Sequence, residues 1–204
     1  MVLEGLKDLN HITMKYLINL VRTDLIQARI LSESDTIHFL KFSFLFLRSR
    51  TCRIHTFLRL RPSNKLISFI SKWYLDKFFI DIGKQTEIDK YFFLPHPKGI
   101  IIANNVKIGS HVHIGQYVTL GGSFKKSKKL QNGDIQKLPI IGNRVMIHPG
   151  AVIGGPVTIG NDVIIGANAV VTRDVPSNSI VFGQNQLAKK KIVIPETGGE
   201  FQVI

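Results

Sequence analysis

The side chains of this chain best suited to proton transfer are its histidines, because an imidazole gains and loses a proton near neutral pH. There are seven: His11, His38, His55, His96, His111, His113 and His148. His96 differs from the rest because Pro95 and Pro97 flank it and restrict the backbone on both sides. A histidine held in this way is suited to act as a general base, which must be positioned before it reacts. The alternative is a turn histidine with a structural role only.

A metal site and a cysteine nucleophile have weaker support. His113 and His148 are 35 residues apart and could be two ligands of a zinc ion. A catalytic zinc ion needs three protein ligands, and the position five residues after His148, where a third would be expected, is Ile153. We therefore predict no metal. Cys52 is the only cysteine, so it cannot form an intrachain disulfide, and no histidine or acid is spaced to activate it.

The elements that position His96 are expected to be short strands, because the sequence after residue 81 has a period of six. An aliphatic residue begins each unit, glycine follows it in eight units, and valine or alanine often takes the fifth place. Typical units are IGSHVH from residue 108, IGQYVT from 114 and IGNDVI from 159. A unit this short cannot bury its own apolar side, so the units must stack into a solenoid. We expect each glycine to supply an unusual backbone angle at a corner.

Residues 12–79 follow a helical period instead. Met14, Leu17, Val21 and Leu25 fall on one helix face. A second helix is predicted from residue 34 to residue 60, and a third over residues 64–78. We therefore divide the chain into a helical region at 1–80, a repeat domain at 81–188 and a tail at 189–204.

Residues 121–139 interrupt the repeat and are expected to protrude as a loop. The segment contains five lysines and one aspartate. One interpretation is a loop that reaches over a bound cofactor or an anionic acceptor. The other is a solvated insertion that binds nothing, since long insertions include both kinds.

The net charge of +13, from 27 basic and 14 acidic residues, indicates an anionic partner. Nucleic acid is not expected, because no recognisable binding module accompanies the charge. A phosphorylated cofactor, an acidic glycan or an anionic lipid surface would satisfy it. Basic and aromatic residues of the helical region could rest on such a lipid surface, or the helices could bury the aromatic side chains and solvate the arginines. The residues concerned are Arg48, Arg50, Arg53, Arg59 and Arg61, beside Phe39, Phe42, Phe44 and Phe46.

The sequence shows neither an export signal nor an apolar run of the roughly 20 residues that span a bilayer. We expect a cytoplasmic protein, with a peripheral position at the inner membrane face as an option.

Residues 82–188 resemble the hexapeptide-repeat acyltransferases, and with the preceding helices they resemble serine acetyltransferases and bacterial polysaccharide O-acetyltransferases. The resemblance implies a mainly β fold, a left-handed parallel β-helix with an N-terminal α-helical region. It also implies a homotrimer that takes acetyl-CoA as acyl donor between subunits and uses no metal. The segment 88–102 resembles the one that holds the family's catalytic histidine, which implies that His96 is the general base.

The same resemblance implies further contacts. Six positions are implied to bind the cofactor: Gly122, Pro149, Gly150, Ala167, Asn168 and Lys189. Lys137 and His113 are implied to contact the acceptor. Lys190 and Lys191 extend the basic run after Lys189.

Two departures from the serine acetyltransferase pattern bear on the acceptor. In serine acetyltransferases an aspartate precedes the catalytic histidine, and Pro95 takes that place here. The same enzymes have an Arg-His pair where this chain has Lys137-Leu138. We therefore predict transfer to a carbohydrate hydroxyl in surface-polysaccharide biosynthesis, with Asp89 or a backbone carbonyl orienting His96. The first alternative is serine O-acetyltransferase of cysteine biosynthesis. The second is a non-catalytic trimeric scaffold or a peripheral membrane-binding protein.

Overall fold

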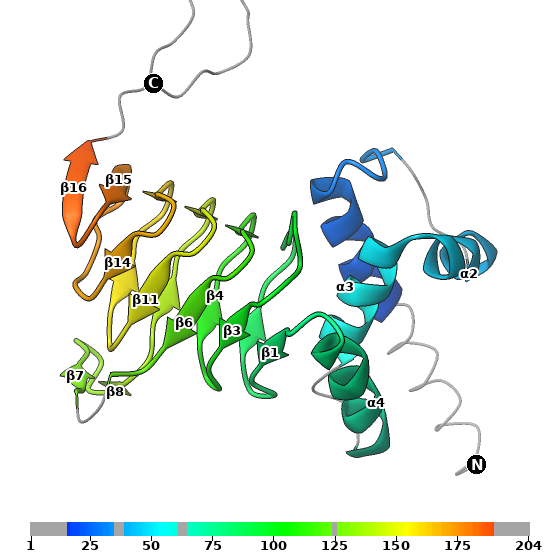
Figure 1. Cartoon of the computed structure of the whole chain (residues 1–204), viewed down its shortest axis with the longest axis horizontal. Coiled ribbons are helices and arrows are strands. Elements are labelled where there is room, and N and C mark those ends of the chain that lie inside the picture. The colour runs from blue at the N-terminus through cyan, green and yellow to red at the C-terminus, as the bar shows by residue number, and fades with distance from the viewer. Residues whose placement is uncertain (1–15, 35–38, 61–64, 124–125, 190–204) are drawn as a thin grey trace, which may run out of the picture.

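A computed structural model describes residues 16–34, 39–60, 65–123 and 126–189 of the chain. The molecule is elongated, with helices at one end and a stack of short strands that runs to β16 at the other (Figure 1). No helix in the described ranges is long and apolar enough to cross a membrane. The mainly β fold with parallel strands that the resemblance implied is confirmed.

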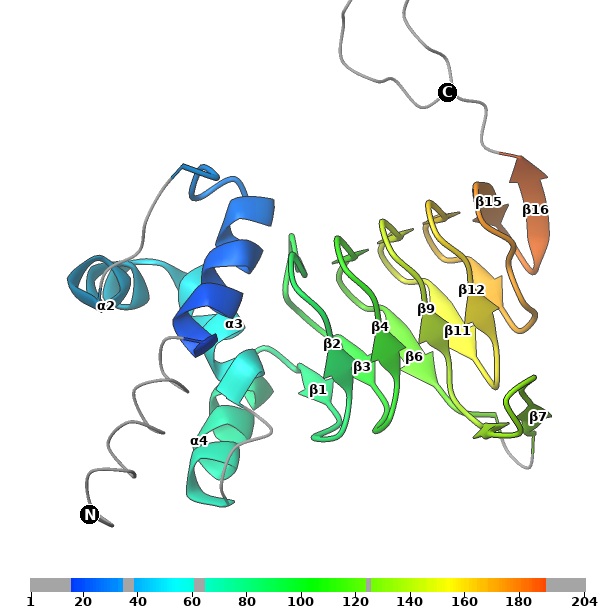
Figure 2. The same cartoon turned by 180° about the vertical axis from the view of Figure 1, so that it is seen from behind.

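The helical region contains a helix over residues 16–27, followed by α2 (Phe39–Arg48), α3 (Arg50–Leu60) and α4 (Lys65–Asp76). The prediction of one helix across residues 34–60 is wrong, because the chain leaves the helix at Ser49. The Ser49 hydroxyl accepts a hydrogen bond from Cys52 N at 3.2 Å and so caps the start of α3. This break turns α2 away from α3 (Figure 2).

The strands form three parallel sheets that each coil of the chain visits in turn, so that residues far apart in sequence stack in register. The first sheet contains β1 (Asp81–Ile82), β3 (Ile101–Ile102), β6 (Thr119–Gly121), β11 (Val152–Gly154) and β14 (Val170–Val171). The second contains β2 (Glu87–Ile88), β4 (Lys107–Ile108), β9 (Ile140–Ile141) and β12 (Thr158–Ile159). The third contains β5 (His113–Ile114), β10 (Met146–Ile147), β13 (Ile164–Ile165), β15 (Ser179–Phe182) and the antiparallel β16 (Gln186–Lys189).

The aliphatic residue that begins each unit points into the coil, as predicted. These side chains are buried in one continuous cluster: Ile108, Ile114, Ile153, Ile159 and Ile165. Valines and alanines from the fifth place of the units fill the remaining space, for example Val112 and Ala169. Burial of this apolar surface by stacking neighbours is what stabilises units that are only a strand and a turn.

The role predicted for the repeat glycines is wrong. Positive φ angles occur at the fourth place of the unit, two residues later, and mostly at residues other than glycine: Asn105, His111, Tyr117, Arg144, Asp162 and Asn168. The glycine in second place is needed for a different reason. A Cβ on Gly142 would lie 2.7 Å from the carbonyl oxygen of Gly160 in the next coil. Glycine therefore allows adjacent coils to approach closely.

Replacement of Gly142 by alanine is expected to lower the free energy of unfolding by about 1–3 kcal/mol, the usual cost of overpacking. The methyl group would meet backbone atoms of the next coil, which cannot move aside alone. Denaturant unfolding measures the loss. Gly154→Ala is the matched control, because a Cβ there meets no atom within 4 Å. Equal stability of the two variants would contradict the close-approach explanation.

Candidate active site

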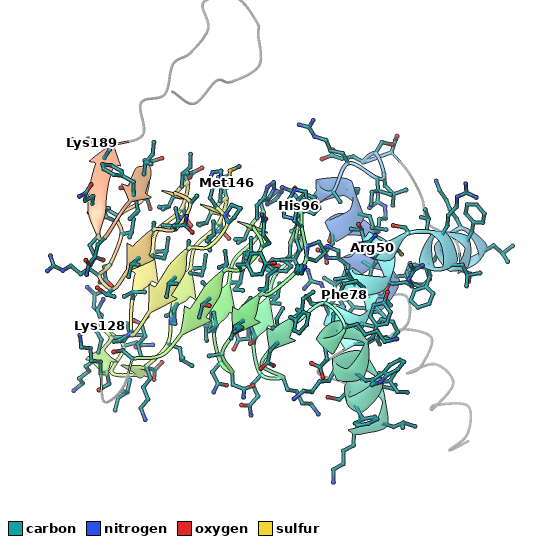
Figure 3. All side chains as sticks on the ribbon, viewed as in Figure 1. Arg50, Phe78, His96, Lys128, Met146 and Lys189 are labelled. Atoms are coloured by element: carbon teal, nitrogen blue, oxygen red, sulfur yellow. The ribbon has the colours of Figure 1, made fainter. Side chains whose placement is uncertain are left out.

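His96 lies in the turn that leads from the third sheet back to the first, in the coil nearest the helices (Figure 3). Before the turn, Phe93 N donates to Val112 O at 3.0 Å. After it, Gly99 has φ +66° and its N donates to Phe78 O at 3.0 Å. The turn is therefore anchored at both ends, while the His96 side chain is exposed.

The turns of the following coils lie along the same edge of the molecule, which we call the His96 edge. Tyr117 N donates to Lys98 O at 3.0 Å, Gly150 N to Gln116 O at 2.9 Å, and Asn168 N to Pro149 O at 2.9 Å. Adjacent strands lie about 4.8 Å apart. Four residues predicted to bind the cofactor thus follow His96 along one edge: Pro149, Gly150, Ala167 and Asn168. An elongated ligand could contact all of them.

Three other predicted residues lie elsewhere. Lys189 ends β16 and pairs with Ser179. It lies at the opposite end of the stack of coils from His96 (Figure 3). Gly122 follows β6 and Lys137 precedes β9, so both belong to the edge between the first and second sheets. Their roles stay predictions, and within one subunit none of the three adjoins His96. Lys190 and Lys191 lie outside the described residues.

His113 packs against the helix over residues 16–27. Its Nε2 forms a hydrogen bond with the side-chain amide of Gln27, and its ring meets Phe93 edge-on with centroids 5.4 Å apart. Burial lowers the pKa of His113, and the neighbouring charge of His111 adds to this. The neutral ring is therefore favoured. Its predicted contact with an acceptor is untested.

The other histidines have packing roles or turn positions. His111 stacks on Tyr91 at 4.4 Å, and His55 is fully buried. No group of three or more possible metal ligands occurs among the residues that the structure describes. His11 and His38 lie outside those residues.

The lysine-rich interruption forms a hairpin of β7 (Lys128–Lys129) and β8 (Ile135–Gln136) beside the last coils. Lys128 pairs with Asp174 of the fifth coil. Burial alone would raise the pKa of Asp174, but hydrogen bonds from Lys128 and from Thr158 N lower it below its ordinary value. At least one lysine of the loop therefore serves to hold the hairpin against the coil.

A buried charged network, which the sequence analysis missed, holds the segment before His96. Asp24 is fully buried, and its carboxylate accepts hydrogen bonds from Arg59 at 2.8 and 2.9 Å and from Phe92 N at 3.0 Å. His55 Nδ1 lies 3.1 Å from the same carboxylate. Arg59 also donates to the carbonyl oxygens of Ile88 and Asp89. The helices are thereby fastened to the first coil.

Two aspartates, Asp81 and Asp89, belong to the same first coil as the turn that carries His96. Asp89 is the residue that we predicted to orient His96. Its side-chain carboxylate accepts a hydrogen bond from Lys90 N at 2.7 Å. Asp81, which the sequence analysis overlooked, begins β1 with an exposed side chain and pairs in register with Ile101, five residues after His96. The only indication of Asp81 in the sequence was its position as the first residue of the repeat domain, in the same coil as His96.

Cys52 is not available as a nucleophile. Its side chain is fully buried in the helical region. Burial raises the pKa of the thiol to about 11, against smaller lowering effects of Thr56 and Arg53.

Comparison with known proteins agrees with the coiled architecture. Residues 139–173 match the family model described as bacterial transferase hexapeptide (six repeats). Over these residues the chain is similar to the bacterial transferase hexapeptide family. Serine acetyltransferase of Helicobacter pylori is 38% identical to it over 104 residues, which are 51% of this chain and 57% of that one. The Staphylococcus xylosus serine acetyltransferase is 38% identical over 119 residues, or 58% of this chain and 50% of the relative.

Solved structures extend the likeness to the helical region. Serine acetyltransferase isoform 3 of Entamoeba histolytica, in complex with cysteine, superposes with a TM-score of 0.62 and 26% identity, over 93% of this chain and 62% of that one. The soybean serine acetyltransferase apoenzyme superposes with a TM-score of 0.64 and 25% identity, over 96% of this chain and 72% of that one. The resemblance stated from the sequence is confirmed. The chain spans about half the length of the curated relatives it matches.

Proposed function

We propose that this protein is an acetyl-CoA-dependent O-acetyltransferase with His96 as its general base. The observation that carries the proposal is the His96 edge, where an exposed histidine in an anchored turn is followed by Pro149, Gly150, Ala167 and Asn168. The similarity to serine acetyltransferases supports acetyl transfer to a hydroxyl.

In the proposed reaction, a ring nitrogen of His96 takes the proton of the acceptor hydroxyl as its oxygen attacks the thioester carbonyl. A new ester bond forms, the carbon–sulfur bond breaks, and the proton is passed on to the departing thiolate. Acetyl-CoA supplies the activated acyl group when bound. The turns of the His96 edge would hold it through Ala167 and Asn168, which are exposed, and through Pro149 and Gly150, which are partly exposed.

L-Serine is the acceptor that we place first. The named relatives favour it over the carbohydrate predicted from the sequence. A carbohydrate hydroxyl remains the second candidate because of one structural observation. Leu138, at the place of the histidine in the Arg-His pair, packs against the core of the coil, so it cannot replace a polar contact to an amino acid.

The acceptor is tested by measuring CoA release from acetyl-CoA with a thiol reagent, in the presence of L-serine or of nucleotide sugars and oligosaccharides. We expect release to require L-serine. Release that requires a sugar instead would select the second candidate. A protein that binds CoA yet releases none with any hydroxyl acceptor would contradict acetyl transfer.

We also propose a homotrimer of left-handed β-helices, with the helical region, the repeat domain and the tail divided as in the sequence analysis. Apolar side chains on the outer face of the first sheet support an assembly between subunits. Ile101, Val152 and Val170 are exposed there in register along β3, β11 and β14. Apolar residues aligned on an outer face are typical of surfaces that meet another subunit.

A further inference from the structure

An exposed apolar face runs the length of α4. Leu66, Phe69, Ile70 and Trp73 follow one another at helical spacing, and Leu66, Phe69 and Trp73 are 68%, 69% and 56% exposed. The opposite side of α4 packs against the protein through Ser71 and Leu75, which are buried. We call the four exposed residues the α4 face. Large side chains left in water along one helix face are typical of a docking surface.

A second exposed apolar face lies on α2. Leu40 and Leu47 are 82% and 77% exposed, and Phe44 lies between them on the same side of the helix. We call these three residues the α2 face. Both helices pack on α3 and lie at the end of the molecule opposite β16 (Figures 1 and 2). The two faces thus belong to the helical end and not to the His96 edge.

Some of the arginines and phenylalanines singled out in the sequence do not contribute to this surface. Arg59 is turned inward to Asp24, and Phe42 belongs to a buried cluster. Arg53 donates hydrogen bonds to Tyr74 and to the carbonyl oxygen of Phe46. The helices therefore bury part of the aromatic and basic run, and the exposed apolar residues are mainly those of α4 and α2.

The charge of residues 39–80, which include α2, α3 and α4, is almost entirely positive. Residues 39–80 contain nine lysines and arginines and one acidic residue, Asp76. Lys65 and Lys72 are exposed on α4, and Lys77 is exposed directly after it. Lys77 Nζ lies 3.8 Å from the centre of the Trp73 ring. An aromatic and aliphatic face bordered by lysines matches the boundary between acyl chains and anionic headgroups. Two copies of the same surface would instead bring like charges together.

We propose that the α4 face, together with the α2 face, docks this protein on an anionic membrane surface. The apolar side chains would enter the headgroup layer, while Lys65, Lys72 and Lys77 contact phosphate oxygens. Such docking would hold the repeat domain near substrates or partners at the membrane. The proposal is independent of the acceptor and of His96.

Trp73 is the only tryptophan of the chain, so its fluorescence reports directly on this face. The full chain is titrated with vesicles of mixed phosphatidylglycerol and phosphatidylcholine, and with phosphatidylcholine alone. We expect the emission to shift to the blue and to be quenched by brominated acyl chains with the anionic vesicles only. High salt should weaken binding, because it screens the headgroup charge.

Two double variants with the same change of net charge distinguish attraction by the lysines of α4 from attraction by the overall charge of the protein. Lys65→Glu with Lys72→Glu should weaken binding to anionic vesicles about tenfold or more. Lys129→Glu with Arg173→Glu, in the hairpin and fifth coil away from the helices, should leave the affinity within twofold. Phe69→Ser should reduce brominated-lipid quenching of Trp73.

Three results would overturn the proposal. One is no change in Trp73 emission with anionic vesicles. Another is equal weakening by both charge-reversal pairs, which would show attraction by overall charge alone. The third is a blue shift without lipid that rises with protein concentration and disappears in Phe69→Ser, because a second copy of the chain would then cover the α4 face.

Discussion

His96→Ala is expected to lower the rate of acetyl transfer by about 10²- to 10⁴-fold, the usual contribution of a positioned general base. The side chain is exposed in a turn held by backbone hydrogen bonds on both sides, so its removal should leave the coil intact. The rate is measured as CoA release with the acceptor identified in the screen. Thermal unfolding and CoA binding should match those of the unmodified protein.

His111→Ala is the matched control for this variant. His111 occupies a turn on a different edge, where it stacks on Tyr91. Its replacement should leave the transfer rate within about threefold, since no proton transfer is assigned to it. A folded His96→Ala protein that binds CoA and transfers acetyl groups at the original rate would remove His96 from the mechanism. Equal losses in both variants would point to a structural effect.

The stacking of the coil was predictable because its signal is local and repeated. An inward isoleucine every six residues leaves no other way to bury the chain, and Ile153, Ile159 and Ile165 lie where that argument placed them. The alignment of Pro149 with Ala167 follows from the same count, since their separation of 18 residues is one full coil. The position of these two residues on the His96 edge required the structure, because an insertion and a register shift intervene.

The predictions for the repeat glycines, for one helix over residues 34–60 and for Arg59 failed for physical reasons that a single sequence conceals. Gly142 makes room for the backbone of the next coil, a contact between residues 18 positions apart. Ser49 ends one helix and caps the next, although its neighbours are all helix-compatible. Arg59 looked like a solvated arginine, but its partner Asp24 is 35 residues away on another helix. Each outcome depends on a tertiary contact, which periodicity alone does not reveal.

Asp24→Ala is expected to lower the free energy of unfolding by about 3–5 kcal/mol, because removing one member of a buried ion pair leaves the other charge uncompensated. Asp24 is fully buried and accepts hydrogen bonds from Arg59 and Phe92 N. Denaturant unfolding measures the loss. Glu87→Ala is the control, since its pair with Lys107 is exposed and should leave stability unchanged within error.

The double variant Asp24→Leu with Arg59→Met separates the charge from the packing. Both charges are then absent, so the loss should be smaller than in Asp24→Ala alone. A loss in the double variant equal to the sum of the single losses would mean that Asp24 and Arg59 do not act as a pair. The network also reaches the active site, since Asp24 holds Phe92 N and Arg59 holds the carbonyl oxygen of Asp89, both a few residues before His96. Any Asp24→Ala protein that remains folded should therefore transfer acetyl groups more slowly. Its affinity for CoA should be retained, because the proposed CoA contacts lie farther along the His96 edge.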